Sequence, residues 1–296
     1  MDNKIQENIL KAGQIEKQVK DYARSFIKKD MPLLEIAEKI EDKIIQLGGK
    51  VAFPTNLSID EVAAHYTPSY NDETLAHGIL KVDIGVQIDG WIADSAFSLD
   101  LENSKENKEL IKASEEGLNA AILCVKQGKS LGELGKAVQE AIQNKGFNPI
   151  INLTGHEMDN YQLHAGISIL NIENSRKEKL EIGLYAIEPF ATKGNGKIYE
   201  GKASGIYIVQ DDRNVRSNEA RQILDYIIEE YQTLPFCSRW LVKKFGTKAL
   251  FALRQLETNG NLHQYAQLVE ASHAKVSQTE NTVFIDEKGN VTVTTE

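Results

Sequence analysis

Residues 81–94 read KVDIGVQIDGWIAD, and this stretch decides the predicted fold. Asp89-Gly90 is a pair typical of the two-residue turn of a β-hairpin. With that turn, Gly85 lies opposite Asp94, so Asp83 and Asp94 are diagonal neighbours on one face, with Cα atoms about 7–8 Å apart. The sequence therefore predicts a hairpin on which two carboxylates meet.

The residues that flank the two aspartates are apolar, so part of this hairpin is predicted to be buried. Two buried like charges are unfavourable unless a cation compensates them, and a divalent metal ion would do so. A hairpin whose aspartates both face water remains the alternative at this point.

Three more polar residues stand beside apolar runs. His156 follows IINLTG (150–155), Glu188 ends an apolar run before Pro189, and Glu280 directly precedes the predicted strand 282–285. Each of them alone is also compatible with a strand end at the water boundary. Together with the two aspartates they form the carboxylate and imidazole set that suits a pair of divalent ions.

The rest of the chain repeats one arrangement. Amphipathic patterns predict two opening helices, over about 5–27 and up to Leu47, followed by the β-rich stretch 78–101. A second pair of helices, 104–127 and from the Ser130–Glu133 capping box to Gly146, comes before further strands. These strands are predicted at 150–154, 166–170, 183–191, 204–210, 282–285 and 290–294. Two helix–helix–sheet units predict a duplicated α+β domain with helices on one face of a sheet.

Residues 218–269 are predicted to be purely helical, with an amphipathic run that closes at Asn259-Gly260. Because strand patterns resume only at 282, we interpret 218–269 as a helical subdomain inserted into one domain spanning 1–296.

The composition excludes several classes of protein. Apolar residues make up 41% and charged residues 26% of the 296 residues, which is typical of a folded globular chain. The 43 acidic residues exceed the 34 basic ones, and the resulting net charge of -9 disfavours a nucleic-acid partner. We expect no signal peptide and no membrane span, and two cysteines without close spacing fit a cytoplasmic protein.

Seven motifs together resemble the type 2 methionine aminopeptidases of peptidase family M24, and most of all their short archaeal form. In chain order they are FPTNLS (53–58), AAHYTP (63–68), KVDIG (81–85), DGWIAD (89–94), NLTGH (152–156), LHAG (163–166) and AIEPF (186–190). The resemblance covers nearly the whole chain, and it includes the helical insertion before the last glutamate that separates type 2 from type 1. It implies the pseudosymmetric pita-bread fold, with the insertion expected to be winged-helix-like.

The resemblance also implies roles for individual residues. The ligands of two divalent ions, whether Co, Mn, Fe or Zn, are expected to be Asp83, Asp94, His156, Glu188 and Glu280. Asp94 and Glu280 are expected to bridge the two ions. His65 and His164 match the imidazoles that contact the substrate near the scissile bond, and Glu188 is the expected proton shuttle.

The implied reaction is removal of the N-terminal methionine of a nascent polypeptide, when the second residue is small, by a water activated between two metal ions. The enzyme is expected to be a monomer. The methionine side chain needs an apolar pocket, for which the candidates are Phe53, Pro54, Leu163 and Tyr265. Two alternatives stay open: a proline-specific peptidase of the same fold, and a non-catalytic pita-bread protein that binds a partner.

The chain departs from the family pattern at one place near the expected ligands. Where the family usually has Glu-His-Thr, this sequence has Glu280-Asn281-Thr282. In a strand the side chain of Asn281 points to the face opposite Glu280, so we expect the ligand to be retained.

Overall fold

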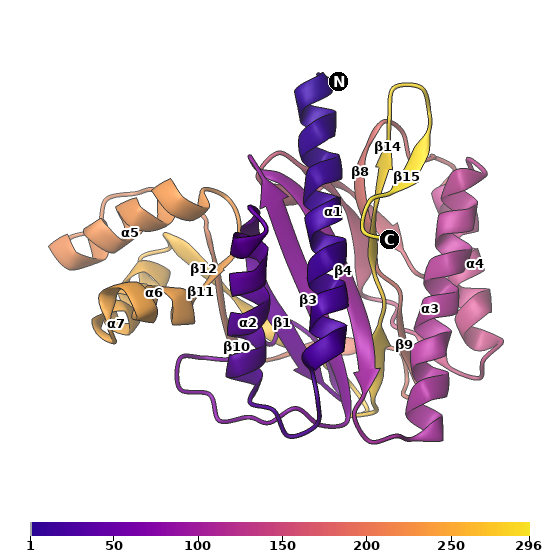
Figure 1. Cartoon of the computed structure of the whole chain (residues 1–296), viewed down its shortest axis with the longest axis horizontal. Coiled ribbons are helices and arrows are strands. Elements are labelled where there is room, and N and C mark those ends of the chain that lie inside the picture. The colour runs from indigo at the N-terminus through magenta and orange to yellow at the C-terminus, as the bar shows by residue number, and fades with distance from the viewer. Residues whose placement is uncertain (1) are drawn as a thin grey trace.

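The computed structural model describes residues 2–296, and its first half is a helical layer on a sheet (Figure 1). Helices α1 (Asn3–Phe26) and α2 (Leu33–Gln46) pack against the antiparallel sheet β1-β3-β4, formed by Lys50–Ile59, Ile79–Ile88 and Trp91–Asp100. Their apolar sides enclose one core cluster that includes Val19, Ile36, Ile40, Val82 and Ile84. This confirms the first predicted helix–helix–sheet unit.

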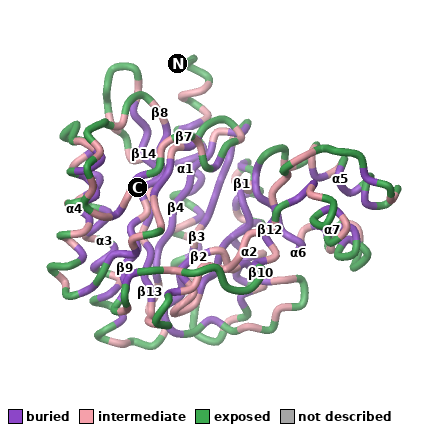
Figure 2. The backbone as a smooth tube through the Cα atoms, turned by 180° about the vertical axis from the view of Figure 1, so that it is seen from behind, coloured by how far each residue is buried: buried purple, intermediate pink, exposed green. Residues whose placement is uncertain are grey.

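The second half repeats the arrangement. Helices α3 (Lys105–Lys126) and α4 (Leu131–Gln143) pack together over strands β5 (Asn148–Pro149), β6 (Thr154–Asp159), β7 (Gln162–Leu170), β8 (Gly183–Ile187) and β9 (Phe190–Thr192). The predicted capping box at Ser130 and Glu133 opens α4. The C-terminal strands β13 (Val276–Gln278), β14 (Asn281–Ile285) and β15 (Val291–Val293) complete sheets β13-β9-β5 and β15-β14-β8-β6-β7. In Figure 2, which shows the molecule from behind, strands β3, β4, β8 and β14 are mostly buried.

The segment predicted to be purely helical, residues 218–269, precedes β13. The prediction is wrong at the C-terminal end of this segment. Helices α5 (Asn218–Tyr231), α6 (Ser238–Phe245) and α7 (Lys248–Thr258) surround their own core, to one side of the sheets (Figure 1). Residues Leu262–Glu270, however, form strand β12 in the sheet β11-β10-β12-β2, with β11 at Phe236–Cys237, β10 at Ile198–Val209 and β2 at Val62–Ala64. Pairing with the long strand β10 overrides the helix-favouring Ala, Gln and Leu residues of this segment.

One strand is missing from the sequence predictions and another needs correction. No strand is predicted for residues 50–59, but they form β1, because bulges around Pro54 allow the strand to pair with β3 despite the missing N–H. The strand predicted at 150–154 begins at Thr154 and continues to Asp159, since the preceding apolar residues form a turn into the core.

A buried ion pair attaches the helical segment to the first half. The Arg239 guanidinium donates two hydrogen bonds to the Glu41 carboxylate, at 2.7 and 2.9 Å, and Trp240 donates a third at 2.9 Å. The same carboxylate accepts from the backbone N–H of Thr55 in β1. Because both charged groups are buried and multiply bonded, this contact fixes α6 against the strand that borders the site described below. None of the helices in residues 2–296 is both long and apolar enough to span a bilayer.

Candidate metal centre

The hairpin β3–β4 has the predicted register. Gly85 pairs with Asp94 and Asp83 pairs with Ala96, so the two aspartates are diagonal neighbours on one face. A Cβ atom on Gly85 would lie 2.2 Å from the Phe53 ring, so only glycine allows that ring to approach the hairpin beside the two carboxylates.

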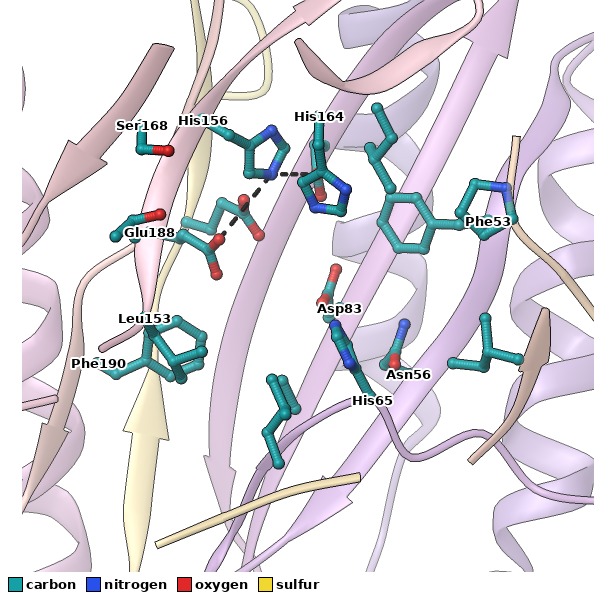
Figure 3. A pocket seen from close by; sticks show the side chains of 18 of the residues that line it. Phe53, Asn56, His65, Asp83, Leu153, His156, His164, Ser168, Glu188 and Phe190 are labelled. Carbon is teal, nitrogen blue, oxygen red and sulfur yellow. Dashed lines mark ion pairs between the residues drawn. The ribbon is translucent and has the colours of Figure 1, made fainter. Parts of the chain in front are cut away.

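The other three predicted residues lie on neighbouring strands of the second half. His156 is on β6, Glu188 directly follows β8, and Glu280 directly precedes β14. Since β8 lies between β6 and β14, the three side chains reach the same region from one sheet. Ligand atoms of Asp94, His156 and Glu280 lie within 4.8 Å of one another, and His156 Nε2 is 3.9 Å from Glu188 Oε1 (Figure 3).

Hydrogen bonds join the two halves at this region. The Thr282 hydroxyl accepts from the Asp94 backbone N–H at 2.8 Å and donates to the Asp94 carbonyl at 2.7 Å. The Glu280 backbone N–H donates to the carbonyl of Ala96 at 2.9 Å. Because Asp94 and Glu280 belong to the joined segments themselves, the join determines where their carboxylates lie.

These side chains line a cavity of about 420 Å³. The lining includes all four carboxylates and His156, together with apolar residues such as Phe53, Leu153 and Phe190 (Figure 3). Of the predicted pocket residues, Phe53, Pro54 and Leu163 are in the lining. Tyr265 is not, because its ring packs edge-on against His65, with centroids 5.4 Å apart. Lining residues that the sequence analysis did not name include Asn56, Ala64, Ile206, Pro235 and Leu268.

Both predicted substrate-contacting histidines face the cavity. His65 has a left-handed backbone, with φ of 62°, and its Nδ1 lies 3.2 Å from the Ala266 carbonyl on β12. His164, on β7, stands edge-on to His156 with ring centroids 4.5 Å apart. His65, which directly follows β2, and His164, on β7, therefore both line the cavity (Figure 3).

Comparison with known proteins agrees with this geometry. The model of metallopeptidase family M24 matches residues 7–224. A methionine aminopeptidase from Pyrococcus horikoshii is 45% identical over 295 residues, covering 98% of this chain and 99% of that protein. The chain belongs to the methionine aminopeptidases of metallopeptidase family M24.

Solved structures of similar fold confirm the predicted pita-bread architecture. A thermophilic Arx1 matches with a TM-score of 0.85 at 16% identity, covering 99% of this chain and 91% of that one. A methionine aminopeptidase from Thermotoga maritima matches with a TM-score of 0.71 at 20% identity, covering 100% and 98%. At these identities the likeness concerns the fold alone.

The charges of this M24 metallopeptidase are unbalanced around the cavity. Burial raises the pKa of Asp83 to about 7, and it raises the pKa of Asp94, Glu188 and Glu280 well above their usual values, with repulsion among the carboxylates adding to the effect. No lysine or arginine is among the described residues that line the cavity. The carboxylates therefore lack a compensating cation from the protein.

The donor atoms fit divalent cations. Asp83 Oδ1 and Asp94 Oδ1 are buried without a hydrogen-bond partner among the described residues, which is costly for a carboxylate oxygen in a protein interior. Burial lowers the pKa of His156 to about 3, so its imidazole is neutral and able to act as a ligand. Oxygen and neutral imidazole donors are the set that binds Mn, Fe, Co or Zn.

Asn281, which departs from the family pattern, lies behind the cavity. Its Oδ1 accepts from the Lys20 ammonium of α1 at 3.0 Å and from the Thr295 hydroxyl at 2.9 Å. The Thr295 hydroxyl in turn accepts from the Thr282 backbone N–H. Asn281 therefore connects α1 and the C-terminal segment to the strand that follows Glu280, and it is not among the residues that line the cavity.

The raised pKa values give a prediction for the metal-free protein. Between the unfolded pKa near 3.8 and the folded value near 7 for Asp83, the folded state binds more protons than the unfolded state, so the free energy of unfolding falls as pH rises. Asp94→Asn removes one charge from the cluster, so between pH 5 and pH 8 the metal-free variant should lose less free energy of unfolding than the metal-free wild type. The two losses should differ by at least about 1.4 kcal/mol, the equivalent of one pKa unit.

Denaturant unfolding of both proteins in chelator at the two pH values measures this difference. Asp225→Asn, which removes an exposed carboxylate of α5 outside the cavity, is the control and should leave the pH dependence unchanged. An Asp94→Asn protein with the pH dependence of the wild type would show that burial and repulsion from the other carboxylates do not raise the pKa of Asp94.

Proposed function

We propose that this chain removes the N-terminal methionine of nascent polypeptides whose second residue is small, with Asp83, Asp94, His156, Glu188 and Glu280 holding two divalent ions. The observation that carries the proposal is a single cavity that joins an uncompensated group of buried carboxylates to an apolar wall. The identity of 45% with a full-length methionine aminopeptidase supports it. The proposal includes a monomeric enzyme in the cytoplasm.

In this proposal Asp94 and Glu280 would contribute to holding both ions, because each lies at the join between the halves and both belong to the convergent group with His156. When bound, the ions would supply Lewis acidity and a water molecule of lowered pKa. The ligand set accepts Co, Mn, Fe or Zn.

The protein's own groups divide the remaining work of the reaction. Glu188 reaches the cavity from the end of β8, and a buried carboxylate of raised pKa is suited to accept a proton and pass it on. We assign to His164 the stabilisation of the tetrahedral oxyanion, since its ring stands beside His156 at the carboxylate end. Burial lowers the pKa of His65 to about 4, so it contacts the substrate as a neutral imidazole.

The shape of the cavity supports methionine as the first residue. Phe53, Pro54 and Leu163 offer an apolar surface for an unbranched thioether side chain. With the methionine seated there and the first peptide bond at the carboxylates, the second residue lies where the histidines crowd the cavity. A small second side chain is therefore favoured.

Two alternatives remain distinguishable from this proposal. A proline-specific peptidase of the same fold would share the five polar residues, but full-length similarity to a methionine aminopeptidase favours the assignment made above. A non-catalytic protein of this fold would not need to retain the acidic set, whereas all five of these side chains line the cavity.

The first functional prediction concerns substrate choice. Met-Ala-Ser should be hydrolysed far faster than Met-Lys-Ser, because the second residue faces the crowded end of the cavity. Release of free methionine by the Mn-loaded protein measures both rates, with a chelator-treated sample as the control. Ala-Pro-Ala tests the proline-specific alternative. Equal rates for the two methionine peptides, or preferential cleavage of Ala-Pro-Ala, would contradict the proposed substrate position.

The second functional prediction separates ion binding from oxyanion stabilisation. Glu280→Ala removes a bridging carboxylate, so bound metal per chain should fall. His164→Ala keeps all five ligands and should retain both ions, while kcat falls by about 10²–10³, as for other oxyanion donors. Metal analysis and kcat measured on the same preparations test both roles. A metal-free His164→Ala protein, or a fully active Glu280→Ala protein with two ions, would overturn them.

A further inference from the structure

His65 has a backbone conformation that its surroundings must hold. Its φ of 62° is uncommon for a residue with a side chain, and such a conformation persists where neighbouring contacts enforce it. The residue directly follows β2 and lines the cavity, and its Nδ1 lies 3.2 Å from the Ala266 carbonyl. Because a carbonyl oxygen only accepts, Nδ1 carries the proton in this contact and Nε2 is left as an acceptor. A shift of this segment would therefore change what the imidazole offers to a substrate.

Strand β1 holds the residues that follow His65 on one side. The Leu57 backbone N–H donates to the Tyr66 carbonyl at 2.6 Å, and the Thr67 hydroxyl donates to the Thr55 carbonyl at 2.9 Å. Both partners belong to the same strand. The backbone just after the left-handed residue is thus tied to the sheet of the first half.

Arg239, from the inserted helix α6, holds the same segment on another side. Its guanidinium Nε donates to the Pro68 carbonyl at 3.0 Å, and its Nη2 donates to the Thr67 hydroxyl at 3.3 Å. The two Nη atoms also donate to the Glu41 carboxylate of α2, at 2.7 and 2.9 Å. Arg239 is only 3% exposed, so water does not replace these contacts readily. One buried side chain therefore joins α2, α6 and residues 66–68.

This set of contacts requires a guanidinium. Arginine carries five N–H donors in a rigid planar fork, so it can pair with a carboxylate through two nitrogens while the other donors reach the backbone of a neighbouring segment. A lysine ammonium could pair with Glu41, but as a compact charge it could not also reach Thr67 and Pro68. Arg239 is not among the residues that line the cavity, so its influence on the reaction has to pass through another residue.

We propose that Arg239 is a positioning residue for His65: its guanidinium holds residues 66–68, and so fixes the place and the tautomer of the imidazole that contacts the substrate. This inference rests on the proposed function, in which His65 makes that contact. An arginine that only anchored α6 would instead contribute to stability, and its replacement would leave the His65 ring and catalysis unchanged.

The kinetic test uses Arg239→Lys, which keeps a positive charge beside Glu41 but removes the fork. In the Mn-loaded full chain, kcat/KM for Met-Ala-Ser should fall by about 10–100-fold, because small misplacements of a substrate-positioning group are costly, while bound Mn per chain stays at the wild-type value. In a His65→Ala background the same substitution should change kcat/KM by less than about twofold, since the group that it positions is gone.

Nitrogen NMR of the metal-free protein observes the His65 ring directly. Burial lowers the pKa of His65 to about 4, so at pH 8 the ring is neutral and its tautomer can be determined. The signals are assigned by their loss in His65→Ala. The wild type should show a protonated Nδ1 and an unprotonated Nε2, whereas Arg239→Lys should show the averaged shifts of two tautomers. This readout does not depend on peptide hydrolysis.

Trp240→Phe is the matched control on the neighbouring residue of α6. The single N–H of the Trp240 indole donates to the same Glu41 carboxylate, at 2.9 Å, and is therefore not available to residues 66–68. This substitution should lower the Tm and leave kcat/KM and the His65 signals unchanged. Thr67→Val removes the hydroxyl that accepts from Arg239 and keeps the ion pair with Glu41. It should lower kcat/KM and disturb the His65 signals, and it serves if Arg239→Lys does not fold.

The outcomes separate this inference from the proposed function. A Mn-loaded wild type that does not hydrolyse Met-Ala-Ser would overturn the proposed function, and the NMR comparison would still decide whether Arg239 positions His65. Unchanged kinetics and unchanged His65 signals in Arg239→Lys and Thr67→Val would overturn only the role of Arg239. Equal losses of kcat/KM with and without His65, or the same loss in Trp240→Phe, would also overturn it, because such a pattern reflects general destabilisation.

Discussion

Mutual repulsion among four carboxylates, two of them buried and two half-buried, is the constraint on which the rest of the structure depends. Asp83, Asp94, Glu188 and Glu280 line one cavity whose described lining contains no lysine or arginine, and burial raises the pKa of each. In the absence of cations such a cluster opposes folding. The fold must therefore hold these groups together with interactions formed elsewhere, and the clustered charge creates a strong preference for divalent ions.

The join between the two halves provides that support. Each half is a helical layer on a sheet and folds around its own apolar core. Along the join, Thr282 is bonded to the backbone of Asp94, Glu280 to Ala96, and Gln278 to Ser98, so residues almost two hundred positions apart are held in register. Backbone hydrogen bonds and the short side chains of Thr282 and Ser98 hold this register. The positions of the carboxylates therefore do not depend on long, flexible side chains.

Local patterns were sufficient to predict the parts of the site that a single hairpin defines. The register that makes Asp83 and Asp94 diagonal neighbours follows from one two-residue turn, and it is confirmed. Strand β12 was missed because its pairing with β10 is long-range and its residues favour helix. Tyr265 lies on that strand, where its ring packs against His65.

Direct observation of the ions tests the account most closely. Crystals of the protein loaded with Mn²⁺, measured at the manganese absorption edge, should show two anomalous peaks in the cavity, about 3.5–4 Å apart. Each peak should lie within bonding distance of Asp94 and Glu280, and the oxygen Asp83 Oδ1, now without a partner, should be bonded to one of them. A cavity without anomalous density, or ions bound only at other surfaces of the protein, would contradict the central claim that these carboxylates form a dinuclear metal centre.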